Sequence, residues 1–531
     1  MEKRLSEFLT PETAATAGLV MRHNSGDPFV CGIEYDSRKI KPGFIYCAQR
    51  GLHTDGHLFI NDAIEKGAIT IIQEEKIDIT RKDAVFLQVK DSRHALSPIS
   101  AAFYGFPSRE LAVIGVTGTE GKSTTVYLIW QLLRLMGKKA GFFSTVQYSS
   151  GNDAQWNSEH QTTPEANAVQ RMLREMADNG VQYAVVEASS HGLSERTKRL
   201  GDVDFDVGVI TNVTHEHLEF HGTWEQYRYD KANLFRALDK TVKNQRLNSP
   251  ASSQLPVKIQ KNSVKPFGVI NADDPSAAYF ASATAQGTVT FSTKNANANL
   301  SLRSIESNSK GNNYEVYISE SKKIIKIEDR LPGTFNAGNV LAALLVASGL
   351  LELPVEDVAE KVIDLQPVRG RMTRIDKGQS FEVLVDYAHT PASFQTIFPP
   401  LRERLDKTGK RIISVFGSAG ERDTKKRFKQ GKIAANYSDI IVLADEDPRG
   451  EVPMAILEEI AQGIDESKTK FIRNENLFLI PDRGAAIRKA FSLAKPGDLV
   501  LLLGKGHENS IIYAEHIMPY DEITEAERAL G

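Results

Sequence analysis

Apolar residues along the chain fall into short continuous runs that alternate with stretches of helical spacing. Runs typical of buried strands cover 69–73, 84–89, 111–116, 182–187 and 205–211, and helical stretches cover 59–66, 92–106 and 124–135. Strands that alternate with helices build a parallel sheet with helices on both faces. The pattern therefore predicts a doubly wound α/β fold.

The same alternation resumes after residue 368, beyond two segments of different character. A polar stretch rich in Asn, Ser and Pro at 240–265 indicates an exposed insertion, and alternating residues over 297–328 indicate a small antiparallel sheet before a long helix at 337–350. The last part predicts strands at 382–386, 411–416, 440–444 and 498–503, and helices at 392–405, 425–437, 454–463 and 484–493.

The length of the chain requires more than one hydrophobic core. Its 531 residues exceed what a single core usually holds. One boundary falls near residue 108, where Gly105 and Pro107 end a helix, and the other falls near 368. We therefore predict three domains, at 1–108, 109–367 and 368–531.

Charge and cysteine content exclude several classes of protein. The 65 Lys and Arg residues nearly balance 68 Asp and Glu residues, leaving a net charge of -3. The chain therefore lacks the excess of positive charge that is typical of nucleic-acid-binding proteins. Cys31 and Cys47 cannot by themselves build a disulfide framework or a zinc site. No apolar run approaches the roughly 18 residues of a membrane span. We expect a soluble, cytoplasmic protein without nucleic-acid or membrane partners.

A phosphate-binding loop is predicted where the strand at 111–116 leads into the helix at 124–135. Its glycines let backbone N–H groups approach phosphate oxygens, and the helix N-terminus adds a positive dipole. Lys122 would reach the β- and γ-phosphates of ATP, and the Ser123 hydroxyl would hold Mg²⁺. Val116 stands where the usual pattern has its first glycine, so a glycine-rich turn without a ligand is the alternative. The predicted ATP-binding residues here are Gly118, Thr119, Glu120, Gly121, Lys122, Ser123 and Thr124.

Ordered motifs over most of the chain resemble those of the Mur ligases, which extend the peptide of the bacterial cell-wall precursor by ATP-driven amide formation. The loop TGTEGKSTT at 117–125 resembles the family's TGTNGKTTT, with Glu120 in place of asparagine. The other matching motifs are EASSHGL at 187–193, NVTHEHLEFHG at 212–222, LPGTFNAGNVLAA at 331–343, GRM at 370–372, VDYAHTP at 385–391, VFGSAGERDTKKR at 415–427, EDPR at 446–449 and GKGHE at 504–508.

Motifs near the N-terminus resemble the UDP-N-acetylmuramoyl-tripeptide synthetase type of this family. They are YDSR at 35–38, DGH at 55–57 and, further on, TTPE at 162–165. The resemblance implies an N-terminal α/β domain for the UDP-substrate, a central P-loop ATPase-like sheet and a C-terminal Rossmann-like domain for an amino acid. It implies that ATP and Mg²⁺ are used to join a diamino acid to UDP-MurNAc-L-Ala-D-Glu through an acyl phosphate.

The resemblance also implies catalytic and metal-binding residues. Ser123 and Glu187 would hold one Mg²⁺, whereas Glu187, His217 and Lys231 correspond to residues around a second ion. The family's matching lysine is carbamylated, which supplies an oxygen donor suited to a hard cation, so Lys231 is expected as N6-carboxylysine. An ordinary solvated helix lysine is the alternative. The implied catalytic set is Lys122, Glu187, His217 and Lys231.

Substrate contacts are implied for two further groups of residues. The nucleotide group is Asn336, Asn339, Arg371 and Asp386, although both asparagines also suit the start of a helix. The UDP-substrate group is Ser37, Arg38, Thr162, Thr163, Ser189, Arg196 and His221. The family's arginine near this last group falls on Thr197 here, so either Arg196 replaces it or the contact is lost.

The incoming amino acid would be held by residues of the last domain. They are Arg422, on the α-carboxylate, with Asp447, Arg449, Gly504 and Glu508. Family members that add meso-diaminopimelate carry DNPR where this chain has EDPR. Arg449 could pair with the distal carboxylate of that substrate, whereas the charge of Asp447 would repel it and attract an ammonium. The sequence favours L-lysine or L-ornithine, with meso-diaminopimelate as the alternative.

Two other functions would use part of the same pattern. A folylpolyglutamate or cyanophycin synthetase would share the ATP motifs but not DSRKIKPG, EDPR and GKGHE. A nucleotide-gated binding protein without turnover would be supported only by Glu120 and the shifted arginine. For the ligase we expect a monomer whose partners are its small-molecule substrates.

Overall fold

The computed structural model describes residues 1–51, 54–76, 82–157, 161–214, 218–240, 264–294, 297–308, 310–465 and 471–531. The chain forms two compact units. Unit 1 comprises Met1–Phe291 and Ala342–Glu352, and unit 2 comprises Ser292–Leu341 and Leu353–Gly531. Of the predicted insertion at 240–265, residues 241–263 lie outside the described ranges.

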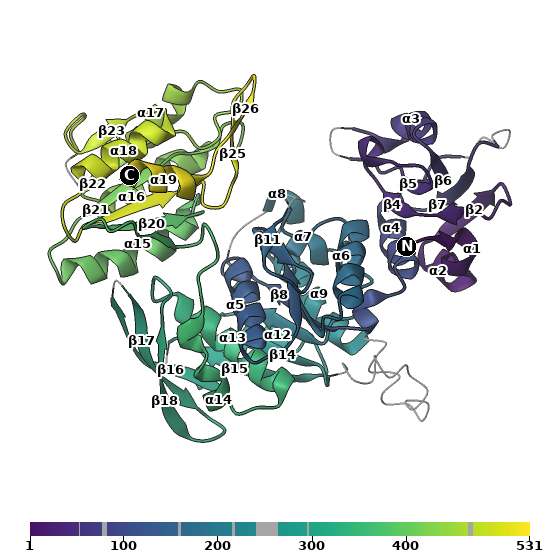
Figure 1. Cartoon of the computed structure of the whole chain (residues 1–531), viewed down its shortest axis with the longest axis horizontal. Helices are drawn as coiled ribbons and strands as arrows, with labels where there is room; N and C mark the ends of the chain where they lie inside the picture. Colours follow the sequence, from purple (N-terminus) through teal and green to yellow (C-terminus); the bar gives the residue numbers. More distant parts are fainter. Residues whose placement is uncertain are drawn as a thin grey trace. The chain divides into compact units, whose positions relative to one another are not determined.

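The first sheet of unit 1 has five strands in the order β2-β7-β6-β5-β4 (Figure 1). Strands β4 to β7 are parallel, and β2 pairs antiparallel with β7. Leu87 packs with α1 and α4 on one face, while Phe86 packs with α3 on the other. The elements are β1 (Lys3–Arg4), α1 (Leu5–Phe8), α2 (Pro11–Thr16), β2 (Leu19–His23), β3 (Phe29–Val30), β4 (Gly32–Glu34), β5 (Phe44–Cys47), α3 (Ile60–Glu65), β6 (Ala68–Gln73), β7 (Val85–Val89) and α4 (Ser92–Phe103).

The second sheet of unit 1 is the predicted doubly wound sheet. Its order within the unit is β11-β10-β9-β12-β8-β13-β14-β15, and the six strands from β9 to β15 in this order are parallel. Helices α6, α9 and α12 cover one face, and α5 covers the other, where Trp130 contacts Phe142. The strands are β8 (Ala112–Thr117), β9 (Ala140–Phe143), β10 (Gln147–Ser149), β11 (Gln155–Trp156), β12 (Tyr183–Glu187), β13 (Val207–Ile210), β14 (Phe267–Asn271) and β15 (Gly287–Ser292). The helices are α5 (Lys122–Leu135), α6 (Ala166–Asp178), α7 (Ser190–Leu193), α8 (Leu218–His221), α9 (Trp224–Lys240) and α12 (Ala277–Ala281).

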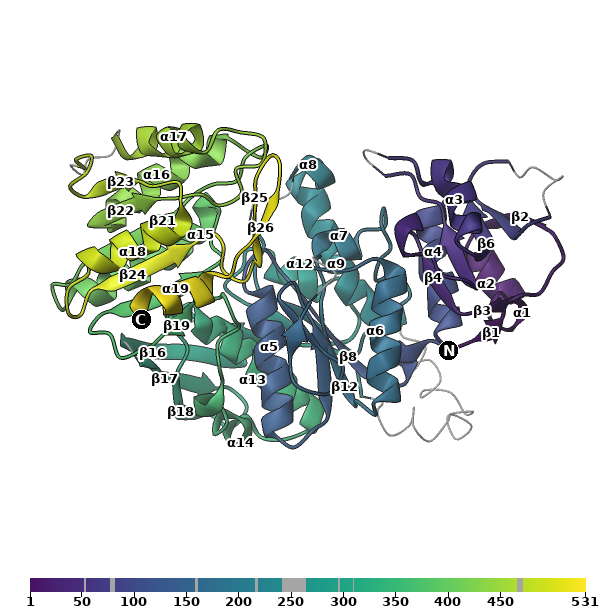
Figure 2. The same cartoon turned by 45° about the horizontal axis from the view of Figure 1, so that its top comes forward.

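The main sheet of unit 2 has the order β19-β20-β24-β21-β22-β23, and only β19 in it is antiparallel to its neighbour. Leu501 of β24 faces α15 to α17, and Leu502 faces α18 and α19 on the opposite side of the sheet. The helices α18 and α19 lie side by side (Figure 2). The strands of this sheet are β19 (Thr373–Ile375), β20 (Glu382–Asp386), β21 (Ile412–Phe416), β22 (Ile440–Leu443), β23 (Leu477–Leu479) and β24 (Leu499–Leu503). A separate two-stranded sheet consists of β25 (Ser510–Ile512) and β26 (Ile517–Pro519). The helices are α14 (Val355–Ala359), α15 (Pro391–Asp406), α16 (Lys425–Tyr437), α17 (Pro453–Asp465), α18 (Arg483–Leu493) and α19 (Glu522–Leu530).

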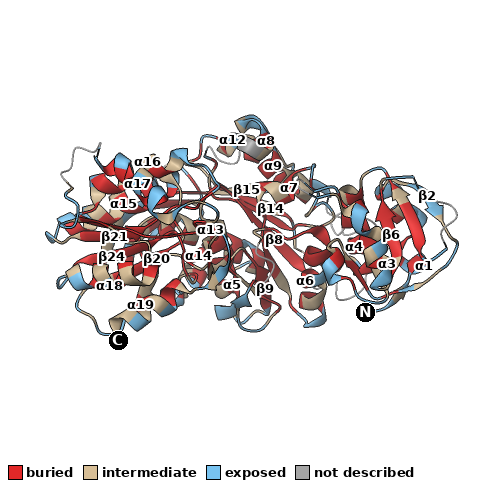
Figure 3. Ribbon diagram, turned by 90° about the horizontal axis from the view of Figure 1, so that it is seen from above, coloured by how far each residue is buried: buried red, intermediate tan, exposed pale blue. Residues whose placement is uncertain are grey.

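The predicted fold class is confirmed, because three α/β sheets follow one another along the chain and their central parallel strands are buried along most of their length (Figure 3). The predicted antiparallel appendage is also present, as β16 (Leu300–Asn308), β17 (Gly311–Ile318) and β18 (Lys323–Asp329). Residues 292–341 group with unit 2, although the sequence analysis placed them in a central domain ending at 367. The division passes through α13 (Asn336–Leu351). No helix within the described ranges is long and apolar enough to cross a membrane.

A buried carboxylate joins the antiparallel appendage to the segment that follows it. Asp329 Oδ1 accepts hydrogen bonds from Asn312 Nδ2 at 2.8 Å and from the Leu331 backbone N–H at 2.9 Å. Asn312 Nδ2 also donates to Leu331 O at 2.8 Å. Burial raises the pKa of Asp329 to about 6, although these donors oppose the shift.

The raised pKa predicts a pH dependence of stability. A carboxyl group that binds its proton more tightly when folded contributes stability below its unfolded pKa, near 4, and that contribution is lost as pH rises through about 6. The full effect corresponds to about 3 kcal/mol. Asp329→Asn keeps the accepting oxygen without a charge and should raise the unfolding temperature at pH 7–8 more than at pH 4–5. Glu328→Gln, at the exposed neighbouring position, is the control. Equal pH profiles of the wild type and Asp329→Asn in thermal unfolding would contradict this origin.

Candidate active site

The predicted phosphate loop connects β8 to α5 and is clamped by the segment that follows β13. Asn212 accepts from the Thr119 and Glu120 backbone N–H groups through its carbonyl and side-chain oxygens, at 2.8 and 2.9 Å. Gly118 has φ +152°, and a Cβ on it would overlap Thr211 Oγ1. Only glycine therefore fits at the entry of the loop.

A buried carboxylate lies beside the start of α5. Glu187, at the end of β12, is 1% exposed and accepts from Ser123 Oγ at 2.9 and 3.0 Å. The Thr145 backbone N–H donates to the same carboxylate at 2.8 Å, and Thr145 Oγ1 donates to it at 3.2 Å. A hydroxyl and a carboxylate that meet at the carboxyl ends of two adjacent parallel strands supply the hard oxygen atoms that Mg²⁺ prefers.

Two lysines donate to carbonyl oxygens of the loop. Lys122 Nζ reaches Thr119 O at 2.7 Å, and Lys231 Nζ reaches Gly118 O at 2.7 Å. Lys231 is 1% exposed and also lies over the Tyr227 ring. It is therefore not a solvated helix lysine.

Residues predicted to contact the UDP-substrate form a linked set beyond β12. Thr163 Oγ1 donates to Glu187 O at 2.9 Å and accepts from the Ser189 backbone N–H at 3.0 Å. Arg199 donates to Thr163 O at 2.9 Å and pairs with Glu165 at 2.7 Å. Arg199 thus fixes the Thr162–Glu165 stretch, a role that the sequence analysis did not assign to any residue.

The position of the family arginine is occupied by a structural threonine. Thr197 is buried, and its Oγ1 donates to His191 O. Arg196 is exposed, lies over the Phe220 ring and donates to Phe220 O at 2.5 Å.

In the N-terminal sheet region, Arg38 is likewise exposed and is paired with Asp36 at 2.8 Å.

His221 belongs to a buried hydrogen-bonded chain that joins α7, α8 and α9. Its Nδ1 lies 2.8 Å from Asp230 Oδ2, and its Nε2 lies 3.0 Å from Ser190 Oγ. The Ser190, His221 and Asp230 residues are 2%, 6% and 1% exposed. Since both ring nitrogens are engaged inside the protein, the geometry gives His221 a structural role and does not support the predicted substrate contact.

The predicted nucleotide residues of unit 2 lie around backbone turns. Asp386 ends β20 and accepts from the Met372 and Ala388 backbone N–H groups at 2.8 and 2.7 Å. Burial raises its pKa, and Arg371 acts in the opposite direction. Asn336 Nδ2 donates to Pro332 O at 2.8 Å, and Asn339 Nδ2 donates to Asn336 Oδ1 at 3.0 Å.

The predicted amino-acid residues of unit 2 include a buried ion cluster. Lys505 is 0% exposed and lies 2.9 Å from Asp447 and 2.5 Å from Glu508. Glu446 is 6% exposed, and its Oε2 has no hydrogen-bond partner within the described residues. A Cβ on Gly504, which has φ +104°, would lie 3.0 Å from that oxygen.

Three non-glycine residues in these segments adopt a left-handed backbone. They are Met372, Glu421 and Arg449, with φ of 50°, 54° and 55°. Such strain is tolerated mainly where the surroundings fix a functional geometry. Arg449 Nε is in addition buried without a partner in the described part of the chain, whereas Arg422 is exposed.

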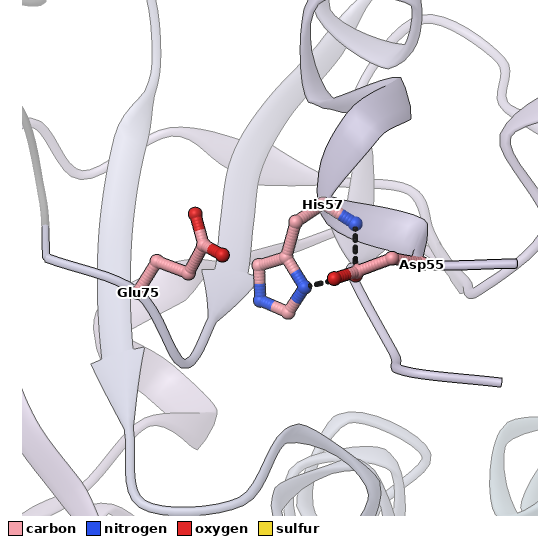
Figure 4. A group of neighbouring side chains, drawn as sticks. All are labelled: Asp55, His57 and Glu75. Atoms are coloured by element: carbon pink, nitrogen blue, oxygen red, sulfur yellow. Dashed lines mark hydrogen bonds and ion pairs between the residues drawn. The ribbon is translucent and has the colours of Figure 1, made fainter.

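A second group of metal-type ligands lies in the N-terminal sheet region, where Asp55, His57 and Glu75 approach one another (Figure 4). His57 Nε2 accepts from the Glu74 backbone N–H at 3.1 Å, so its proton resides on Nδ1, which contacts Asp55 Oδ1 at 2.6 Å. Arg50 pairs with Glu75 at 3.3 Å. These contacts give the three side chains a structural role, and we assign no metal to the group.

Comparison with known proteins decides the family. The chain matches the Mur ligase family catalytic domain over residues 30–104, the Mur ligase middle domain over 116–265 and 251–347, and the glutamate ligase domain of Mur ligases over 370–506. It is 52% identical to a UDP-N-acetylmuramyl-tripeptide synthetase of Treponema denticola, over 94% of this chain and 93% of that protein. The chain belongs to the Mur ligase family.

Other Mur ligases are similar over nearly the full length. A protein of Geobacillus thermodenitrificans named UDP-N-acetylmuramoyl-L-alanyl-D-glutamate--2,6-diaminopimelate ligase is 34% identical, covering 96% of each chain. A solved structure of a ligase with that name has a TM-score of 0.61 and 26% identity, covering 94% of each chain. The MurF ligase of Thermotoga maritima in complex with ADP shares the fold, with a TM-score of 0.60, 22% identity and coverage of 89% and 93%.

The structure of this Mur ligase brings together part of the predicted site. Lys122, Ser123, Glu187 and Lys231 surround the loop in unit 1, and Asp447, Gly504 and Glu508 gather in unit 2. His217 lies outside the described residues. Thr145, Arg199, Glu446 and Lys505 were missed. A signal existed for two of them, since Glu446 and Lys505 stand inside quoted motifs.

The buried chain through His221 yields a stability prediction. Asp230→Ala would leave the Nδ1 side of a buried imidazole without its partner and should cost about 1–3 kcal/mol of unfolding free energy. Glu225→Ala changes an exposed acid on the same helix and should cost less than about 1 kcal/mol. Equal losses for the two variants in denaturant unfolding would show that the chain does not stabilise the fold.

Proposed function

We propose that this Mur ligase joins a diamino acid to UDP-MurNAc-L-Ala-D-Glu, using ATP, in peptidoglycan synthesis. The relatives that carry the corresponding names align with 94% and 96% of the chain. The structural observation that supports the proposal best is the Ser123–Glu187 pair beside the clamped loop. A hydroxyl and a carboxylate beside this loop could hold the Mg²⁺ that accompanies the phosphates of ATP.

Amide formation from a carboxylate needs an activated intermediate, because oxide is a very poor leaving group. Transfer of the γ-phosphoryl group of ATP to the substrate carboxylate gives an acyl phosphate, which the amine then attacks with loss of phosphate. Lys122, at the start of α5, would screen the two anions as they approach. The loop N–H groups and the α5 N-terminus would hold the phosphates.

Mg²⁺ fits the donors present around the loop. Ser123 and Glu187 would hold the ion, which when bound would neutralise phosphate charge. Thr145 orients the Glu187 carboxylate through its backbone N–H and its hydroxyl. His217 is proposed from the sequence alone.

We further propose that Lys231 is carbamylated. A buried ammonium beside a bound cation would be repelled, whereas a carbamate would add an oxygen donor. Lys231 already points at the loop from within the protein, with Nζ at 2.7 Å from Gly118 O. Incubation with ¹³C-bicarbonate should therefore give a carbamate signal in the ¹³C NMR spectrum. Lys231→Met should lack this signal, and its persistence in the variant would assign it to another site.

For the amino acid we propose L-lysine or L-ornithine, on grounds that differ from the sequence argument. Asp447 is paired with Lys505 and accepts from the Ile512 backbone N–H at 3.0 Å, so little of its charge remains for a ligand. Glu446 takes its place, because its buried Oε2 has no partner within the described residues. In this part of the site there are three carboxylates, those of Glu446, Asp447 and Glu508, and two cations, those of Lys505 and Arg449. This imbalance favours a cationic side chain over the zwitterionic end of meso-diaminopimelate.

The enzyme is proposed to act as a cytoplasmic monomer, since ATP and nucleotide-linked precursors are supplied inside the cell. Light scattering of the purified chain tests the oligomeric state.

Phosphate release tests the reaction. It should require ATP, Mg²⁺, UDP-MurNAc-L-Ala-D-Glu and a diamino acid together. Lys122→Met should lower kcat by about 100-fold or more, whereas Lys139→Met, at an exposed position between α5 and β9, should leave it unchanged. Release that depends on a folate instead, or no release with any combination, would refute the proposal.

Parallel assays with L-lysine, L-ornithine and meso-diaminopimelate test the amino acid. Glu446→Gln removes the unpaired buried carboxylate and should lower kcat/KM for the preferred cationic substrate by about 30-fold or more. Asp447→Asn should change the ratio between substrates less, because Lys505 already neutralises Asp447. A wild-type preference for meso-diaminopimelate would overturn the assignment.

A further inference from the structure

An arginine at the start of α18 is fully buried in unit 2 and donates hydrogen bonds to one carboxylate and two backbone carbonyl groups. The Arg483 side chain is 0% exposed. It donates to both carboxylate oxygens of Glu522 at 2.6 and 2.8 Å, to Asp445 O at 3.0 Å and to Leu503 O at 2.7 Å. Although burial alone would lower the pKa of Arg483, the Glu522 carboxylate raises it, so the guanidinium stays charged.

Leu503 is the last residue of β24 and Asp445 follows the end of β22, and these two strands are not neighbours. The sheet order β24-β21-β22 places β21 between them. The β21 ladder ends at Val415 opposite Leu502 on one side and at Phe416 opposite Leu443 on the other. Asp445 and Leu503 therefore lie beyond the last pairs with β21, and Arg483 joins them where pairing with β21 has stopped.

Each carbonyl immediately precedes residues proposed to hold the amino acid. Asp445 is followed by Glu446 and Asp447, and Leu503 is followed by Gly504 and Lys505. A second link joins the same two segments from the side chains, because Lys505 contacts Asp447 at 2.9 Å. The spacing between the segments is thus fixed at two points, one of which is Arg483.

We propose that Arg483, held by Glu522, is a positioning residue for the incoming amino acid. The planar guanidinium of Arg483 sets the distance between the segment beginning at Glu446 and the segment beginning at Gly504. This distance in turn sets the width of the amino-acid site. A lysine carries one compact ammonium and cannot reproduce this planar geometry. The inference rests on the proposed function, since it concerns the substrate of that reaction.

The opposite edge of the same sheet offers a matched control. Arg411 pairs with Asp498 through two bonds of 2.6 and 3.0 Å and donates to Leu493 O at 2.8 Å. This arginine also joins a carboxylate to a backbone carbonyl, but it lies at the beginning of β21 and β24. Its loss should weaken the fold without changing the amino-acid site.

The test compares Arg483→Met/Glu522→Gln with Arg411→Met/Asp498→Asn, each of which removes both charges and leaves no buried ion alone. The first variant should raise KM for the amino acid by about tenfold or more, while KM for UDP-MurNAc-L-Ala-D-Glu stays within about twofold. The second should leave both KM values within about twofold, whatever its unfolding temperature. Arg483→Lys, which keeps the charge, should show an intermediate rise.

Three results would overturn the positioning role. They are an unchanged amino-acid KM in the folded Arg483 variants, equal rises of KM for all substrates, and the same rise in the Arg411 variant. If the first double variant does not fold, Arg483→Lys and Glu522→Gln alone decide by the same comparison. A wild type that ligates no amino acid refutes the proposed function instead, so the two failures are distinguishable.

Discussion

At the carboxyl edge of a parallel sheet the backbone ladder stops, and the polar groups beyond it must find other partners. In this Mur ligase side chains meet that requirement on both doubly wound sheets. Asn212 and Glu187 do so next to the phosphate loop, and Asp386 and Arg483 do so in unit 2. Because buried polar groups are costly when unpaired, these contacts fix the loops on which the chemistry depends.

The sequence predicted the sheets well because buried parallel strands consist of continuous runs of apolar residues. The predicted strand at 382–386 is β20 (Glu382–Asp386), and the predicted helix at 425–437 is α16 (Lys425–Tyr437). The edge strand β19 was missed, since its three residues give too short a pattern. The predicted central domain of 109–367 also differs from the grouping of residues 292–341 with unit 2, and apolar periodicity alone carries no signal for that grouping.

Within the site, the sequence predicted a contact where two motifs follow the carboxyl ends of adjacent strands. Ser123 and Glu187 were expected together, and they are bonded. It did not predict internal pairs at positions where the resemblance implied a ligand contact instead. Asp447 was treated as a free charge, yet Lys505 pairs with it. His221 was assigned to substrate, yet Asp230 and Ser190 occupy both of its nitrogens, and no motif records that pairing.

The contacts of the phosphate loop have a consequence for ligand binding. Lys122 donates to Thr119 O, and Ser123 donates to Glu187, so the groups proposed to receive phosphate and metal each already have a partner within the protein. Binding there is an exchange in which internal hydrogen bonds are broken as new ones form. The net free energy gained from a nucleotide is then much smaller than its contacts suggest. Because these contacts hold the loop in shape, a nucleotide would not have to order the loop on binding.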